Sequence, residues 1–184
     1  MQVQQSPLAG VKILTPKKFG DHRGFFSEVY NEAALREAGV SFHIVQDNHS
    51  LSATAGTIRG LHFQIPPRAQ AKLIRVVRGR IFDVAVDLRR SSPTFGRHFA
   101  AELSAENWAQ LYVPIGFAHG FCTLSGDAEV LYKVSDFYSP EHDRGLAWDD
   151  PDLEIAWPIA GLTPVLSEKD RAWPRLRDLK DHFP

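Results

Sequence analysis

The apolar residues of this chain recur in short runs rich in Val, Ile, Leu and Phe, separated by Gly, Pro, Ser, Asn and Asp. Many short runs at fairly even spacing, with turn residues between them, are typical of the strands of a β-sandwich or barrel. We therefore expect an all-β fold with a few short helices. The expected strands are Val11–Leu14, Phe25–Tyr30, Lys72–Val77, Arg80–Leu88, Arg97–Leu103, Trp108–Val113, Gly116–Leu124 and Ala128–Phe137, with β pattern from Ile44 onward.

Two turn sequences predict hairpins. Arg78-Gly79 separates two Val- and Ile-rich runs, and Ser125-Gly126-Asp127 separates the last two expected strands. Glycine between two strand-like runs favours a tight turn that pairs them.

Helix signals are few. A short Ala-rich helix is expected over residues 31–39. Asn31 can cap its N-terminus, Glu32 suits the positive end of the helix dipole, and Gly39 can end the helix. Short helical turns are also expected near Ser167–Ala172.

Composition excludes several classes of protein. The 184 residues suit one domain, residues 1–184, and the formal net charge of −1 favours neither nucleic acid nor an anionic membrane as a partner. No apolar run approaches the roughly 20 residues that span a bilayer. Cys122 is the only cysteine, which fits a reducing cytosol. We expect a cytoplasmic protein.

Two dense segments, Gly56–Gln64 and Pro114–Phe121, are spaced like the paired motifs of cupin barrels. This resemblance predicts a double-stranded β-helix, or jelly-roll barrel. In metal-binding cupins two histidines and a glutamate of the first motif and a histidine of the second bind the metal. Here Gln64 stands in place of one histidine and no glutamate follows, so we expect no metal. No Gly-x-Gly-x-x-Gly fingerprint is present, so we expect no redox cofactor.

The remaining side chains favour proton transfer. His62 has the intrinsic pKa of a general base, Lys72 suits a developing oxyanion, and Tyr132 suits a proton donor from another direction. A base, an oxyanion stabiliser and a second acid predict epimerisation beside a carbonyl. Each residue alone is more often structural, and only their joint place among the motifs favours catalysis.

At these residues the chain resembles the dTDP-4-dehydrorhamnose 3,5-epimerase family. The resemblance runs from about Gly20 to Pro174 and rests on many ordered motifs. Among them are Asp21-x-Arg23-Gly24-x-Phe26-x-Glu28, Gln46-Asp47-Asn48-x-Ser50, Gly56 to Gln64, Gln70-x-Lys72-Leu73, Gly79 to Arg89, Tyr132-Lys133, Tyr138-x-Pro140, Asp143-Arg144-Gly145 and Ser167-x-Lys169-Asp170.

The resemblance implies a role for each matching residue. His62 is the expected base, Asp170 its carboxylate partner, Lys72 the group at the ketone oxygen and Tyr132 the acid on the opposite face. The implied substrate-binding residues are Arg23, Glu28, Gln46, Asp47, Asn48, Arg59, His119, Tyr138, Asp143 and Lys169. It also implies a homodimer, often with exchanged N-terminal strands, for which Val11–Leu14 is a candidate.

One conflict and three alternatives stay open at this point. Arg59 and His62 have opposite parity in a regular strand, so both face one pocket only if Gly60 allows a bulge. The alternative functions are a metal-dependent cupin, a non-catalytic sugar-nucleotide binding module, and an epimerase that inverts carbon 3 alone on a related dTDP-4-ketosugar.

Overall fold

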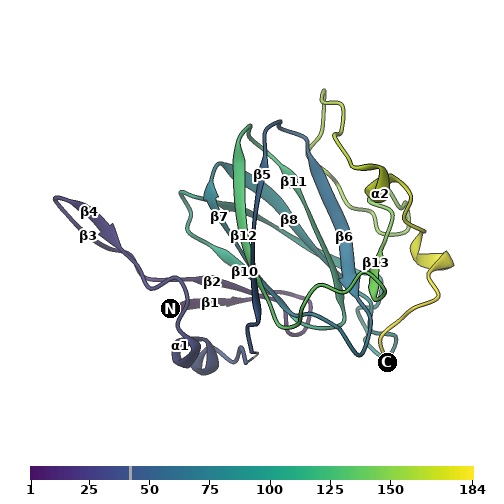
Figure 1. Cartoon of the computed structure of the whole chain (residues 1–184), viewed down its shortest axis with the longest axis horizontal. Helices are drawn as coiled ribbons and strands as arrows, with labels where there is room; N and C mark the ends of the chain where they lie inside the picture. Colours follow the sequence, from purple (N-terminus) through teal and green to yellow (C-terminus); the bar gives the residue numbers. More distant parts are fainter. Residues whose placement is uncertain (42) are drawn as a thin grey trace.

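The computed structural model describes residues 1–41 and 43–184, and most of their strands form two antiparallel sheets that face one another (Figure 1). The six-stranded sheet has the order β1 (Gln2–Gln5), β2 (Lys12–Thr15), β10 (Gln110–Val113), β7 (Lys72–Arg78), β12 (Ala128–Val134) and β5 (Gln46–Ser52). The five-stranded sheet has the order β13 (Asp143–Gly145), β6 (Ile58–Gln64), β11 (Phe117–Thr123), β8 (Arg80–Asp87) and β9 (His98–Ser104). The predicted all-β fold is confirmed.

Apolar side chains fill one part of the space between the sheets. Ile74 and Val130 from the six-stranded sheet meet Ile81 and Phe121 from the five-stranded sheet in one buried cluster. Because side chains alternate along a strand, every second residue of β7, β11 and β12 also points inward. The inner faces therefore offer positions for polar groups where the apolar filling ends.

Both predicted hairpins are wrong. β7 and β8 lie in different sheets, and so do β11 and β12. Gly79 has a left-handed φ of 72°, and a Cβ there would lie 2.4 Å from the hydroxyl of Ser125. The turn at Gly79 therefore carries the chain across from one sheet to the other. Glycine marks the turn correctly, but the neighbouring sequence does not say which strand becomes the partner.

The N-terminal third differs partly from expectation. Of the expected strand Phe25–Tyr30, only Phe25 and Phe26 lie in a strand, as the end of β4 (Gly24–Phe26). This strand pairs with β3 (Phe19–Asp21) in a small hairpin that projects away from the sheets (Figure 1). Helix α1 (Glu32–Glu37) lies where the helix was predicted, and Asn31 accepts a hydrogen bond from the backbone of Ala34 as its N-cap. Within residues 1–41 and 43–184, no helix is long and apolar enough to cross a membrane.

The C-terminal segment runs along the β6 and β13 side of the barrel (Figure 1). Leu146, Leu153, Leu179 and Phe183 cover the outer face of the five-stranded sheet. The segment includes helix α2 (Glu168–Arg171), close to its predicted place, and a 3₁₀ turn, η1 (Leu176–Asp178). This packing brings residues near position 170 against β6, more than a hundred residues earlier in the chain.

Candidate active site

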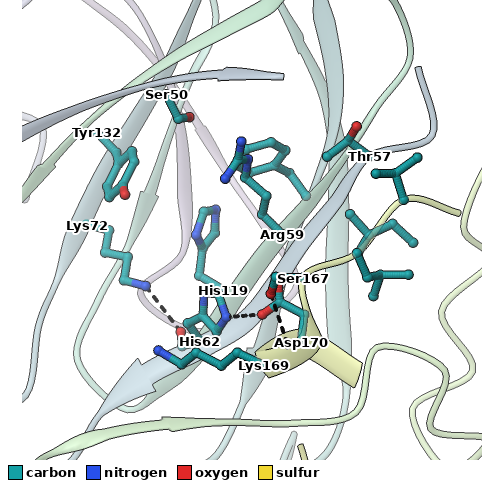
Figure 2. A pocket seen from close by; sticks show the side chains of 14 residues that line it. Ser50, Thr57, Arg59, His62, Lys72, His119, Tyr132, Ser167, Lys169 and Asp170 are labelled. Atoms are coloured by element: carbon teal, nitrogen blue, oxygen red, sulfur yellow. Dashed lines mark hydrogen bonds and ion pairs between the residues drawn. The ribbon is translucent and has the colours of Figure 1, made fainter. Parts of the chain in front are cut away.

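A cavity of about 450 Å³ opens between the inner faces of the two sheets and under the segment that ends in α2 (Figure 2). β6 and β11 form one wall, while β5, β7 and β12 form the other. Seven of the predicted site residues line it: Arg59, His62, Lys72, His119, Tyr132, Lys169 and Asp170.

A bulge in β6 brings Arg59 and His62 to the same cavity. His62 pairs with His119 of β11, whereas Arg59 pairs with Phe121, so β6 holds one residue more than its partner strand. Gly60 within the bulge has a φ of 130°, and a Cβ there would lie 2.6 Å from the Cα of Gly120. Only glycine fits this left-handed, close backbone approach. The bulge proposed from sequence is confirmed.

His62 and Asp170 form a hydrogen-bonded pair. His62 Nε2 donates to Asp170 Oδ1 at 2.5 Å, and the carboxylate is almost fully buried while the imidazole side chain is 32% exposed. Burial by itself raises the pKa of Asp170, but the hydrogen bond and charge of His62 outweigh it, so the pKa is lowered. An ionised carboxylate only accepts hydrogen bonds, which leaves Nδ1 of a neutral His62 as the basic nitrogen.

Lys72 is a buried cation on the opposite sheet. Its Nζ donates to the backbone oxygen of His62 at 3.1 Å, so the ammonium lies beside the base. Burial lowers the pKa of Lys72 to about 8, although the negative charges of Asp143 and Asp83 oppose that change. A poorly solvated ammonium interacts strongly with a charge that develops next to it.

Tyr132 lies on β12, across the cavity from His62 (Figure 2). Burial raises the pKa of its phenol, an effect that the positive charge of Arg59 partly offsets. The phenol therefore keeps its proton at neutral pH. Arg59 is held toward β5, because its Nε donates to Ser52 Oγ and its Nη2 to the backbone oxygen of Leu51.

His119 is fixed by a residue that the sequence analysis did not single out. Its Nε2 donates to Asp83 Oδ1 at 2.7 Å, and both side chains are buried. Asp83 stands within the apolar run of β8. A charged residue inside such a run was the available signal, because a buried carboxylate needs a partner.

A second hollow of about 290 Å³ adjoins the cavity and shares His62, Lys72, Tyr132 and Lys169 with it. Four further predicted site residues line it: Gln46, Asn48, Tyr138 and Asp143. The Tyr138 hydroxyl donates to Asp143 Oδ2 at 3.2 Å, and Lys169 pairs with the same carboxylate. Over half of Tyr138 is exposed, so its ring is open to an incoming aromatic group.

Three predicted site residues lie elsewhere. Asp47 pairs with Lys133 at 2.6 Å on the outer face of the six-stranded sheet, since it alternates with the inward Gln46 and Asn48. Arg23 is exposed on the β3–β4 hairpin, where it pairs with Asp21. Glu28 is exposed beyond the end of β4. None of these three side chains lines the cavity of its own chain.

Gln64, which stands where metal-binding cupins have a histidine, forms hydrogen bonds with the backbone of two neighbouring loops. Its amide nitrogen donates to the backbone oxygens of Arg68 and Phe137, and its oxygen accepts from the backbone of Ser139. Among the described residues, no group of three or more His, Cys, Asp or Glu side chains is arranged to hold a metal ion.

Comparison with known proteins gives one consistent family. A family model for dTDP-4-dehydrorhamnose 3,5-epimerase matches residues 5–178. The Sinorhizobium fredii dTDP-4-dehydrorhamnose 3,5-epimerase is 56% identical over 183 residues, which cover 100% of this chain and 93% of that protein.

Two solved structures show the same architecture. The Bacillus anthracis dTDP-4-dehydrorhamnose 3,5-epimerase, with TDP and PPi bound, is 53% identical with a TM-score of 0.92, covering 95% of this chain and 98% of that one. The Legionella pneumophila dTDP-6-deoxy-D-glucose-3,5-epimerase, in complex with dTDP-4-keto-L-rhamnose, is 42% identical with a TM-score of 0.91, covering 97% and 94%. The predicted cupin-type fold is confirmed.

Proposed function

The chain belongs to the dTDP-4-dehydrorhamnose 3,5-epimerase family, and on this basis we propose that it converts dTDP-4-dehydro-6-deoxy-D-glucose to dTDP-4-dehydro-L-rhamnose. The observation that carries the proposal is the meeting of His62, Lys72 and Tyr132 in one cavity, with base and acid on opposing sheets. Inversion at a carbon requires that the proton leave one face and return to the other. Opposing walls meet this requirement, whereas a base and acid on one wall would restore the starting configuration.

The proposed chemistry is proton transfer beside the 4-ketone. Nδ1 of His62 takes the proton from carbon 3 or carbon 5, and the C–H electron pair moves into an enolate whose oxygen carries the charge. Lys72 donates to that oxygen, and the Tyr132 phenol then protonates the carbon from the other face. His62 and Tyr132 return to their starting states by proton exchange with solvent. Asp170 stabilises the imidazolium without taking its proton.

The two hollows suggest how the substrate lies. The sugar occupies the cavity around His62, while Tyr138 stacks on the thymine ring in the adjoining hollow. Arg59, His119 and Lys169 offer donors to the diphosphate and sugar oxygens, and Gln46 and Asn48 contribute amides.

We further propose that the protein acts as a homodimer in which the β3–β4 hairpin reaches a second copy. Phe19, Phe25 and Phe26 on this hairpin are 52%, 57% and 66% exposed. An isolated two-stranded hairpin is only marginally stable in water, and a group of exposed apolar side chains usually marks an interaction surface. Burial of this hairpin against a second copy covers the phenyl rings and carries Arg23 to the partner's cavity. In the partner's cavity Arg23 has the substrate-binding role that its family motif implies.

The test is proton NMR of the protein with dTDP-4-dehydro-6-deoxy-D-glucose in D₂O. Deuterium entering at both carbon 3 and carbon 5 supports the proposal, and deuterium at carbon 3 alone assigns the 3-epimerase activity instead. His62→Ala should lose about 10²–10⁴-fold in rate, the usual contribution of a general base. His49→Ala is the control, because His49 is an exposed histidine paired with Glu129 on the outer face. Normal exchange in His62→Ala would refute the assignment of the base.

A further inference from the structure

Trp173 follows α2 and lies flat against the backbone of Gly145 in β13. A Cβ at position 145 would come within 2.5–2.6 Å of three indole atoms, and Gly145 has no left-handed φ that would itself require glycine. The indole therefore explains why this position has no side chain. Gly145 pairs directly with His62 in the β13–β6 ladder, so Trp173 rests on the strand segment that flanks the base.

The indole also approaches the base from the side. The rings of Trp173 and His62 pack edge to face, with centroids 6.1 Å apart and an interplanar angle of 70°. The backbone N–H of Ala147 donates to the backbone oxygen of Pro174 at 2.8 Å, which fastens the Trp173 segment to the chain that continues from β13. Trp173 thus contacts the strand and the ring whose positions decide where Nδ1 of His62 points.

The indole N–H is buried and meets no acceptor in hydrogen-bonding geometry among residues 1–41 and 43–184. A buried N–H without an acceptor is costly, so a nearby acceptor is to be expected. Asp170 is that neighbour. Burial raises the pKa of its carboxyl, whereas hydrogen bonds from His62 and Ser167 lower it, and Trp173 lowers it further. Charged groups on the surrounding elements include Lys169, beside Asp170 on α2, and Asp143 of β13, which pairs with Lys169. They also include Lys72 of β7, which donates to the backbone oxygen of His62.

We propose that Trp173 is a positioning residue for the His62–Asp170 pair: its ring wedges α2 against β13 and β6, and its indole N–H donates to the Asp170 carboxylate as His62 takes up a proton. The inference rests on the proposed epimerase function. As His62 becomes an imidazolium, Asp170 must remain the anionic acceptor, and a second donor on the carboxylate favours that ionised form. Trp173 itself touches neither the sugar nor the migrating proton.

The first test is Trp173→Phe, which removes the N–H and keeps an aromatic ring. Without the donor the ionised form of Asp170 is less favoured, so the pKa of this carboxyl rises. Because His62 and Asp170 take up protons as one coupled pair, the acid limb of kcat should then move away from its wild-type position. We expect kcat to fall about 10-fold at neutral pH, the usual worth of a hydrogen bond to a charged group, with KM almost unchanged. A wild-type acid limb in Trp173→Phe, or a loss seen only in KM, would overturn the proposal.

Trp157→Phe is the matched control. Its indole Nε1 donates to the backbone oxygen of Trp148 at 2.7 Å and its ring packs on Phe82, away from the cavity. This variant loses the same N–H, so it reports the cost to folding of a Trp→Phe change. Its acid limb should remain that of the wild type. An equal shift in both variants would mean that the effect is general and would also count against the proposal.

A second readout needs no substrate. The chain has four tryptophans, and the indole N–H signal absent from the ¹H–¹⁵N spectrum of Trp173→Phe is that of Trp173. We expect this signal to move as Asp170 titrates and to shift in Asp170→Asn, while the Trp157 signal stays in place. A Trp173 signal indifferent to both changes would refute the contact. Because this readout is independent of turnover, failure of the epimerase proposal and failure of the Trp173 proposal are told apart.

Discussion

Lys72 shows at the scale of a single residue how function can oppose stability. The residue is 8% exposed, and the pKa of its ammonium falls from 10.5 to about 8 because burial disfavours the charged form. A fall of this size corresponds to a cost on the order of 3 kcal/mol for holding the charged side chain in the folded protein at neutral pH. We infer that this cost is retained because the charge faces the position where the enolate oxygen forms.

Lys72→Met should therefore stabilise the fold while abolishing most turnover. The unfolding free energy should rise by about 1–3 kcal/mol near pH 7, since a methionine of similar length needs no solvation. The unfolded lysine titrates near 10.5 and the folded one near 8, so the gain should be complete below pH 8 and vanish toward pH 10.5. Turnover should fall about 10²–10³-fold, as when an oxyanion donor is lost.

Urea unfolding at several pH values measures this effect, with the exposed Lys180→Met as control. A Lys72→Met protein that is less stable than the wild type at pH 7 would contradict the argument.

The same group sets an expected alkaline limit on activity. Lys72 loses its proton as pH rises through about 8, so kcat should decline above that value. Tyr132 does not cause this decline, because burial raises the pKa of its phenol above the usual range. In Lys72→Arg the guanidinium stays charged, so the decline should move to higher pH even though the maximal rate is lower. A pH–rate profile of both proteins is the measurement, and an unchanged alkaline limb in the arginine variant would reject Lys72 as its source.

At the scale of the element, the bulge of β6 makes the site possible. Without the extra residue Arg59 and His62 would point to opposite faces, one into the cavity and one into the apolar layer outside. Gly60→Ala should lower the unfolding free energy by about 2–4 kcal/mol, because it combines a left-handed φ with a backbone clash. Gly24→Ala has nearly the same φ, 133°, but open space around its Cβ within its own chain, and so gives the cost of the φ without a clash inside the chain.

Thermal unfolding of the two glycine variants compares them directly. Gly60→Ala should also lose turnover in proportion to the distortion of β6. Equal destabilisation in both variants would mean that the close approach to Gly120 contributes nothing.

The sequence predicted well which segments form helices and strands, but it did not predict which strands pair with one another. The pattern located α1 and its Asn31 cap, and it placed β7 within a residue of its observed end. Local propensity and alternation act within a few residues, so they are readable from a window of sequence. The turn at Gly79 was assigned to a hairpin because the choice of partner strand depends on packing across the whole barrel. The projecting β3–β4 hairpin was missed, as its strands are only three residues each.

At the scale of the whole molecule, the site is assembled from segments that only the fold brings together. His62, Lys72 and Tyr132 stood out because their side chains carry chemistry, but their convergence depends on the two facing sheets. Asp170 was paired with His62 only through family resemblance. Trp173 and Asp83 act through neighbours rather than at the cavity, so a list of reactive residue types does not find them.

The last prediction concerns the assembly of two chains. Sedimentation velocity should give a dimer, and Arg23→Ala should lose about 10-fold or more in kcat/KM, since it removes a charge-assisted contact.

If Arg23 acts in the partner's cavity, two inactive or impaired variants should rescue each other. A mixed dimer of His62→Ala and Arg23→Ala has one site with an intact His62 and an intact Arg23 from the other chain. Free reassortment of equal amounts should then restore about a quarter of wild-type activity, because half of the dimers are mixed and each has one complete site. If Arg23 served its own chain, no mixed dimer would contain a complete site and mixing would restore nothing, and a monomer in sedimentation would reject the assembly itself.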